Sequence, residues 1–137
     1  MKIYCSYAGK EFCQLFVESN GVLFPSSDWE DFCIYILLDW ICVVEQCSHM
    51  DQVEFKLYFM DGPYYMLCKK DGTTVKVIGV HEGEDSSKFQ ESISYSDLQG
   101  VLHRTAADIV RYAMESHIET TDLIELKNLI IKINLDE

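Results

Sequence analysis

The sequence predicts a single α+β domain covering residues 1–137, in which a largely antiparallel sheet of about six strands packs against a buried helix and two C-terminal helices. Three observations lead to this prediction. Short β-prone runs separated by turn residues fill two regions, 2–25 and 52–95. A strongly apolar run at residues 32–44 lies between them. Two segments with helical spacing of apolar residues end the chain.

The first region is typical of a β-meander. Strands are expected at residues 2–7, 11–18 and 22–24. Asn20-Gly21 should join the last two of them, because these residue types tolerate the positive φ angles of a type I′ turn. Pro25 should end the third strand, since proline has no backbone N–H to give to a sheet.

A helix is expected to begin near Ser27 and to run to about Gln46. Ser27 is followed three residues later by Glu30, which is the spacing of a capping box. The apolar side chains that follow cover more than one side of this helix. Such a helix is buried on more than one face, so we expect it between the sheet and the C-terminal helices or at a dimer interface.

The second region should form strands at residues 52–60, 63–69, 73–80 and 92–95, with a polar loop at 81–90. Strict alternation in the first of these strands predicts one buried face, made of Val53, Phe55, Leu57 and Phe59. Asp61-Gly62 is expected to be the tight turn that sets the register with the next strand. Ser96 and Gln99 have the spacing of a capping box and start a helix to about Ser116, and residues 119–122 cap the last helix.

The formal net charge of −12 bears directly on the kind of partner. A surface this acidic repels phosphate backbones, so direct binding of nucleic acid is not expected. It suits a basic protein partner, because complementary fields speed encounter and reject wrong partners. An acidic surface that serves only solubility is the alternative.

The compartment is expected to be the cytoplasm. The N-terminal residues include no unbroken apolar signal region, and the run at 32–44 is shorter than the roughly 20 residues of a membrane helix. No membrane association is therefore expected. The six cysteines include no C-x-x-C pair, and without an export signal we expect all of them to be reduced thiols.

The sequence contains no catalytic or phosphate-binding motif. Cys42, Cys47 and His49 are the tightest Cys/His cluster, but a zinc site would need a second pair of ligands. We therefore expect no metal, no cofactor and no enzymatic activity. A cysteine nucleophile stays open, because its partners need not be near it in sequence.

The candidate partner-binding residues are acidic and aromatic: Glu82, Glu84, Asp85, Asp61 and Tyr64. The three acids of the polar loop form a dense negative patch that suits a basic partner, or that is simply solvated. The hairpin at residues 57–69 carries tyrosines on both faces, so at least one should be partly exposed. An exposed tyrosine is a frequent anchor of protein interfaces.

One resemblance combines these features. The chain contains, in order, the Ser19-Asn20-Gly21 turn, the segment SSDWEDF at 26–32, an apolar helix, the segment LYFMDGPY at 57–64 and a two-helix tail. This order resembles the small bacterial immunity proteins of contact-dependent growth inhibition and related polymorphic toxin systems. The resemblance implies a non-catalytic protein that binds and blocks one cognate toxin domain, often a nuclease.

Two other functions stay open at this point. The apolar helix around Trp40 would also suit a homodimeric structural or assembly module. A pocket between the sheet and the helix would instead suit a small enzyme or a small-ligand-binding domain.

Overall fold

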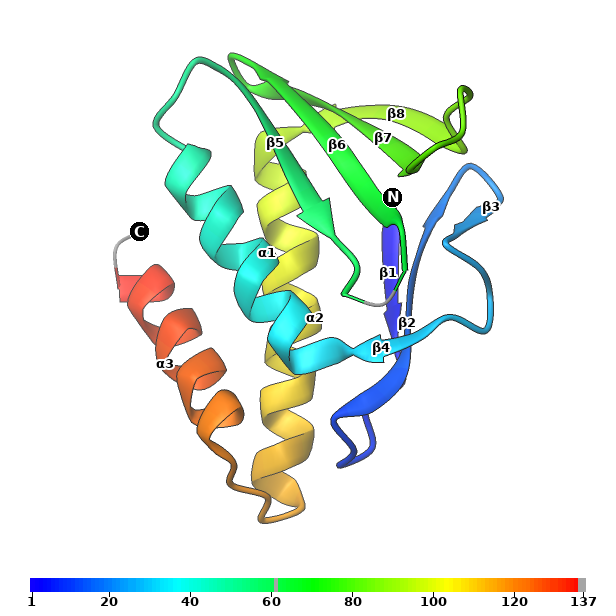
Figure 1. Ribbon diagram of the computed structural model, residues 1–137. Helices are drawn as coiled ribbons and strands as arrows, with labels where there is room; N and C mark the ends of the chain where they lie inside the picture. The colour runs from blue at the N-terminus through cyan, green and yellow to red at the C-terminus, as the bar shows by residue number, and fades with distance from the viewer. Residues whose placement is uncertain (61, 136–137) are drawn as a thin grey trace.

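The computed structural model describes residues 1–60 and 62–135, without the side chain of Leu135, and arranges them as two four-stranded antiparallel sheets and three helices (Figure 1). The strands are β1 (Lys2–Cys5), β2 (Phe12–Ser19), β3 (Val22–Phe24), β4 (Glu30–Phe32), β5 (Gln52–Tyr58), β6 (Tyr64–Asp71), β7 (Thr74–His81) and β8 (Phe89–Ser94). The helices are α1 (Cys33–Cys47), α2 (Tyr95–Glu115) and α3 (Thr121–Leu135). The α+β class predicted from the sequence is confirmed, and its strands are divided between two sheets.

In the first sheet, β1, β3 and β4 all pair with β2. Asn20 and Gly21 have φ angles of 51° and 87°, so the predicted turn between β2 and β3 is confirmed. The last part of β2 pairs with β3, whereas its first part pairs with β4 and places Cys13 opposite Asp31. The chain between β3 and β4 therefore leaves the sheet and returns to the same strand.

The predicted helix start at Ser27 is wrong, because Glu30–Phe32 forms β4 and α1 begins only at Cys33. The N-cap residue of α1, Phe32, makes no capping hydrogen bond through its side chain. The buried carboxylate of Asp31 accepts hydrogen bonds from Trp29 Nε1 at 3.0 Å and from the backbone N–H of Met60 at 3.1 Å. These contacts, together with pairing to β2, outweigh the local capping-box signal.

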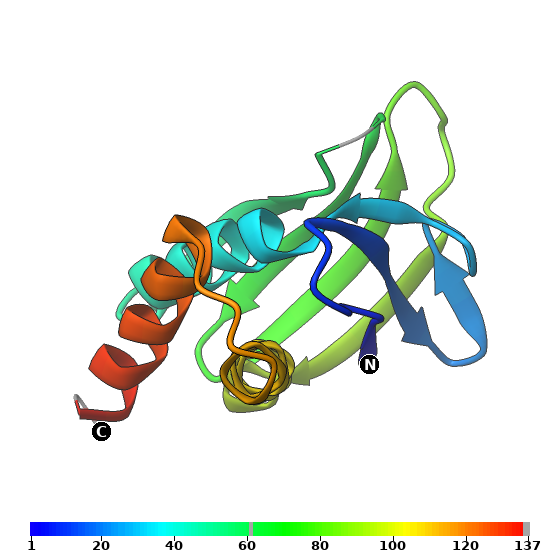
Figure 2. The same ribbon diagram turned by 90° about the horizontal axis from the view of Figure 1, so that it is seen from below.

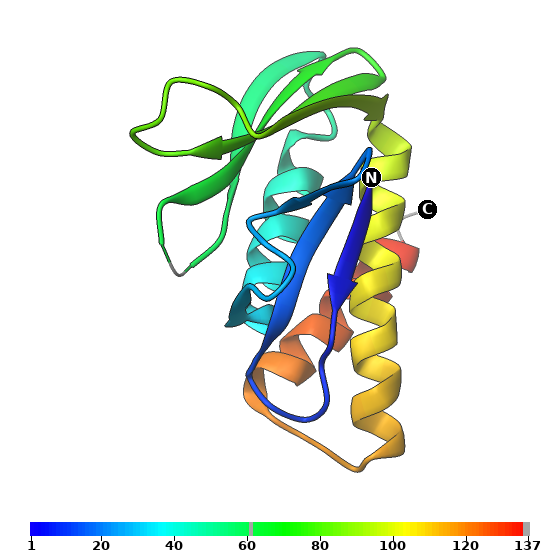
Figure 3. The ribbon, with the colours of Figure 1, turned by 90° about the vertical axis from the view of Figure 1, so that its right-hand side faces the viewer.

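α1 lies at the centre of the molecule and contacts β2, β5, α2 and α3. Figures 2 and 3 show the first sheet and α3 on opposite sides of the α1–α2 pair. The prediction that this helix lies between the sheet and the C-terminal helices is confirmed for α3, whereas α2 lies beside α1. Its buried residues are Cys33, Ile34, Ile36, Leu37, Trp40, Ile41, Val44 and Cys47.

The second sheet is a meander in the order β5-β6-β7-β8. Phe55, Leu57 and Phe59 are buried and Val53 is half-buried, so the predicted inward face of β5 is confirmed. Lys70 on β6 is also buried, with Nζ directed to the carbonyl oxygen of Met50 just past α1. One continuous core joins both sheets to the helices.

The C-terminal helices are confirmed, with one difference at the start of α2. Ser94 caps α2 by accepting a hydrogen bond from the backbone N–H of Asp97 at 3.1 Å, so the helix starts slightly earlier than the predicted box at Ser96. In α3, the carboxylate of Asp122 accepts from the N–H of Leu123 at 2.9 Å. Within the described residues, no helix combines the length and apolarity needed to cross a membrane.

Cys13 and Cys33 form a disulfide, so the prediction that all six cysteines are reduced thiols is wrong for this pair. Pairing of β2 with β4 brings the two residues together, with their Cα atoms 6.3 Å apart. This proximity depends on tertiary structure, because the two cysteines are 20 residues apart in sequence. Cys5, Cys42, Cys47 and Cys68 are free.

Candidate functional site

Two loops meet at one end of the second sheet and bring most of the predicted partner-binding residues together. Tyr64 and His81 are opposite each other on β6 and β7, and their rings stack with centroids 4.5 Å apart. The backbone N–H of Glu82 donates to the carbonyl oxygen of Pro63 at 2.8 Å. Tyr64, His81, Glu82, Glu84 and Asp85 are called the acidic face below. Asp61, also predicted to bind a partner, lies outside the described residues.

Tyr64 forms the aromatic wall of this surface. Its ring is half-buried and meets the edges of Trp29 and Phe24, at centroid distances of 5.1 and 5.7 Å. Gly62 has a φ of 92°, and a Cβ added there would lie 3.0 Å from the Trp29 ring. Any other residue at position 62 would be strained by the positive φ and would crowd the Trp29 ring, so glycine suits this position beside Tyr64.

The second tyrosine of the hairpin lies on the opposite face of the sheet. Tyr65 is half-buried, and its ring lies 5.4 Å from that of Tyr58, centroid to centroid. The ammonium group of Lys56 stands 4.9 Å from the centre of the Tyr65 ring. Tyr65 therefore belongs to an aromatic and basic cluster separate from the acidic face.

The three acids of the loop are exposed, but they do not have the same electrostatic surroundings. Glu84 contacts Lys88 Nζ and His81 Nδ1, the latter at 2.8 Å. Hydrogen bonding to Lys88, followed by the contact with His81, lowers the pKa of Glu84 from its ordinary value. Glu84 consequently stays ionised, and its contacts with Lys88 and His81 offset part of its charge within the loop. Glu82 and Asp85 are the other exposed acids of this loop.

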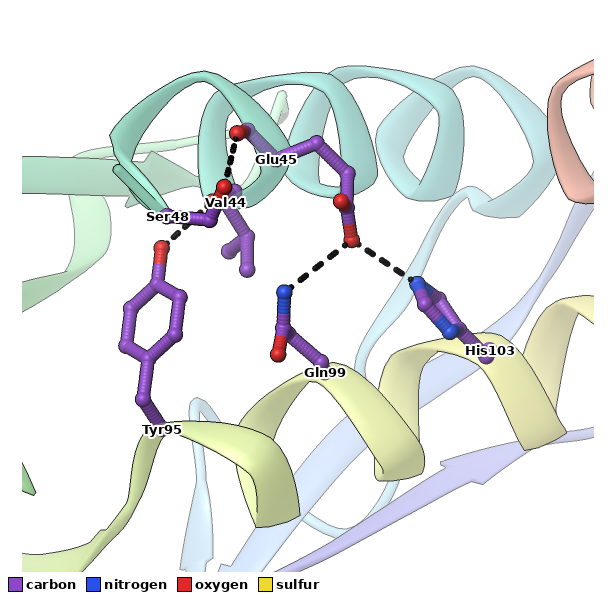
Figure 4. Close-up of polar contacts among 6 residues, drawn as sticks. All are labelled: Val44, Glu45, Ser48, Tyr95, Gln99 and His103. Atoms are coloured by element: carbon purple, nitrogen blue, oxygen red, sulfur yellow. Dashed lines mark hydrogen bonds and ion pairs between the residues drawn. The ribbon is translucent and has the colours of Figure 1, made fainter. Parts of the chain in front are cut away.

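A second polar cluster joins α1 to α2, and Figure 4 shows it in close-up. One carboxylate oxygen of Glu45 lies 3.1 Å from His103 Nε2 and accepts from Gln99 Nε2 at 3.4 Å. The hydroxyl of Tyr95 donates to the carbonyl oxygen of Val44 in the same helix contact. His103 and Glu45 are 58 residues apart in sequence, so their contact depends on the packing of α1 against α2 and has no local sequence signal.

The charge of Glu45 in this pair also acts on the thiol of Cys42. Cys42 lies one helical turn from Glu45 on α1 and is exposed. Burial of its sulfur and the charges of Asp39 and Glu45 raise the pKa of Cys42. A nucleophilic thiol requires a lowered pKa, so the cluster fits an interhelical contact better than a catalytic dyad.

A cleft of about 620 Å³ separates part of α2 from α3. Its walls include Val110, Met114 and Leu123, and its polar groups include His117 and Lys127. The volume is within the range of small-molecule sites, which is roughly 300–1,000 Å³. This cleft lies between the two C-terminal helices, whereas the sequence suggested a pocket between sheet and helix.

Comparison with known proteins found no matching family model, curated protein or solved structure. The class that the fold and the surface define is an acidic α+β domain with paired loops at one end of an antiparallel sheet.

Proposed function

We propose that this protein is a non-catalytic, cytoplasmic immunity protein that binds a cognate bacterial toxin domain and neutralises it. The toxin domain would be basic, for example a nuclease. The observation that carries the proposal is the acidic face, in which the loop that holds exposed Glu82 and Asp85 is bound to the Tyr64 hairpin through Glu82 and His81, in a chain of net charge −12.

Charge and shape contribute differently to such an interface. The net negative field would steer a basic partner toward the chain and raise the association rate. Tyr64, held between His81 and Trp29, offers a rigid aromatic contact that loses little conformational entropy on binding. A surface of this kind can occupy the nucleic-acid-binding groove of a nuclease, because its carboxylates compete with phosphates for the same basic residues.

The structure gives less support to the alternative function, a homodimeric structural or assembly module. This alternative depended on an apolar helix that needed a covering partner, and most apolar side chains of α1 are buried within the chain against both sheets and both other helices, with Tyr35 and Cys42 exposed. The cleft between α2 and α3 keeps a ligand-binding function open, but its polar groups do not include any residue of the acidic face.

Reversing two charges on the acidic face is expected to weaken toxin binding by about 10- to 100-fold, mainly through slower association. The variant is Glu82→Lys/Asp85→Lys, which leaves Glu84 and its contacts with His81 and Lys88 intact. Binding to the toxin domain encoded beside this chain's gene is measured by calorimetry and stopped-flow kinetics at low and high salt. Protection of cells that express the toxin domain should fall in parallel.

The matched control is Glu115→Lys/Glu125→Lys, which makes the same change in net charge at exposed positions of α2 and α3. This control variant should keep most of the affinity for the toxin domain. It changes the net charge, and so the long-range attraction, but it leaves the acidic face unchanged. An equal loss of affinity in both variants would show that the acidic face is not the binding surface. Absence of any binding by the unaltered chain would overturn the proposed function itself.

A further inference from the structure

Three cysteines from three separate elements converge at the side of the first sheet. Cys5 ends β1, Cys13 lies in β2 and Cys33 is the first residue of α1. Their three Sγ atoms all lie within 4.8 Å of one another, and Cys5 Sγ is 3.9 Å from Cys13 Sγ. In residues 1–60 and 62–135, no other group of three His, Cys, Asp or Glu side chains meets this geometric condition for holding a metal ion.

The backbone holds these residues in place through regular pairing. The strand β1 pairs with β2 up to Cys5, and the next backbone bond joins Ser6 N–H to the Gln14 carbonyl oxygen at 3.0 Å. The N–H of Cys33 donates to the carbonyl oxygen of Glu11 at 3.3 Å, which fixes the start of α1 against β2. Because the site is built on paired strands and a helix start, its backbone is organised before a ligand arrives.

The sulfur separation matches the geometry of thiolate coordination. A zinc–thiolate bond is about 2.3 Å long, so two sulfurs on one ion lie about 3.8–4.0 Å apart. The Cys5–Cys13 separation of 3.9 Å falls in this range, whereas the sulfurs of Cys13 and Cys33 are bonded to each other and must move apart after reduction before both can hold one ion. Sulfur is the only ligand type in the cluster, and three thiolates select soft, thiophilic cations over magnesium or calcium.

The cluster also has a route of access from solvent. Cys5 lines a cleft of about 240 Å³ together with Tyr7, Asp108 and Tyr112. Cys13 and Cys33 lie deeper, with only 8% and 0% of their surfaces exposed. An ion entering beside Cys5 would therefore meet one accessible thiol first and two buried thiols behind it.

We propose that the reduced protein binds one thiophilic d¹⁰ cation, of the Zn²⁺, Cd²⁺ or Cu⁺ class, through Cys5, Cys13 and Cys33. Reduction of the Cys13–Cys33 disulfide comes first. A dithiol reductant supplies two electrons and two protons, breaks the S–S bond and becomes a cyclic disulfide. The cation then displaces three thiol protons to solvent and forms three metal–sulfur bonds. The disulfide form lacks two of the three ligands, so the oxidation state of this pair decides whether the ion binds.

Such a site is compatible with a reducing compartment, where a disulfide between buried cysteines would not persist in every molecule. Either the disulfide or the ion would join β2 to the start of α1, and only the ion would also tie in β1. The proposal does not depend on the toxin-binding function, because the acidic face contains none of these cysteines.

The experiment is a titration of the full-length, metal-free chain with Cd²⁺ without oxygen. It compares protein reduced by a dithiol, then separated from it, with protein in which the disulfide is intact. Thiolate-to-metal charge-transfer absorption and native mass spectrometry report the stoichiometry. The expected result is one Cd²⁺ per reduced chain and a loss of affinity of at least about 100-fold in the oxidised chain.

Cys5→Ser tests the assignment of the ligands, and Cys42→Ser is its matched control at an exposed cysteine outside the cluster. Cys5→Ser should weaken Cd²⁺ binding by about 100-fold, and Cys42→Ser should leave it unchanged. Formation of the Cys13–Cys33 disulfide on oxidation, mapped by peptide mass, verifies that the Cys5→Ser variant is folded. Equal Cd²⁺ affinity in the two variants, or in reduced and oxidised protein, would overturn the proposal.

Discussion

Replacing Trp40 with alanine is expected to lower the free energy of unfolding by about 3–5 kcal/mol. The Trp40 side chain is fully buried, and its ring meets the edge of Phe59 at a centroid distance of 5.1 Å. Its Nε1–H donates to the carbonyl oxygen of Tyr58 at 2.8 Å, at the end of β5. Truncation would therefore leave a cavity between α1 and the second sheet and would remove the donor from the Tyr58 carbonyl oxygen.

Urea denaturation followed by far-ultraviolet circular dichroism measures this loss. Tyr35→Ala is the control, because Tyr35 lies on the same helix but is 60% exposed, and its truncation should cost no more than about 0.5 kcal/mol. Trp40→Phe should fall between them, since it keeps most of the volume and loses the hydrogen bond. A cost below about 1 kcal/mol for Trp40→Ala would contradict the central position of α1 in the core.

Replacing Asp31 with alanine is expected to cost about 3–5 kcal/mol as well, for a different reason. The Asp31 carboxylate is fully buried and accepts from the Phe32 N–H at 2.9 Å, in addition to Trp29 Nε1 and the Met60 N–H. Removal would leave these donors inside the protein without their acceptor. Since Trp29 packs on Tyr64, the effect should extend to the acidic face.

The control for this prediction is Glu30→Ala, which removes the same charge from the neighbouring exposed residue of β4. It should change stability by no more than about 0.5 kcal/mol. Asp31→Asn should also destabilise, because its amide group turns one acceptor into a donor that faces N–H groups. Equal changes in the free energy of unfolding for Asp31→Ala and Glu30→Ala would contradict this prediction. They would mean that the Asp31 carboxylate does not stabilise the contact between β4 and Met60.

Features encoded by neighbouring residues could be predicted from the sequence. Asn20 and Gly21 determine their own turn through backbone conformations that few other residues tolerate. The alternation at Val53, Phe55 and Leu57 likewise follows from the pleat of one strand. The class of fold emerges from such local signals, because each strand or helix carries its own pattern of burial.

Features that depend on distant contacts could not be predicted in the same way. The Ser27–Glu30 spacing is a genuine helix-start signal, but a buried carboxylate one residue later binds groups from elsewhere in the fold. The division of the strands into two sheets depends on the pairing of β2 with three partners, which no single strand reveals. The disulfide between Cys13 and Cys33 has the same origin.

The candidate site was predicted in part. Exposure of Glu82 and Asp85 follows from a polar loop, and this was confirmed. The stacking of Tyr64 on His81 and the neutralising contacts of Glu84 depend on the register of β6 with β7 and on the path of the loop. From composition alone, Glu84 is one more exposed negative charge. In the structure, contacts with His81 and Lys88 offset part of that charge.

The fluorescence of the two tryptophans can report on two different events. Indole emission shifts with the polarity of its surroundings, and the two rings have very different surroundings. Trp29 is half-buried beside Tyr64 and Gly62, so its emission should change when the end of the second sheet is covered. Trp40 is sealed between α1 and the sheet, so its emission should change only when the chain unfolds. A Trp40→Phe chain would thus signal occupancy of the acidic face, and a Trp29→Phe chain would signal folding, each without an added label.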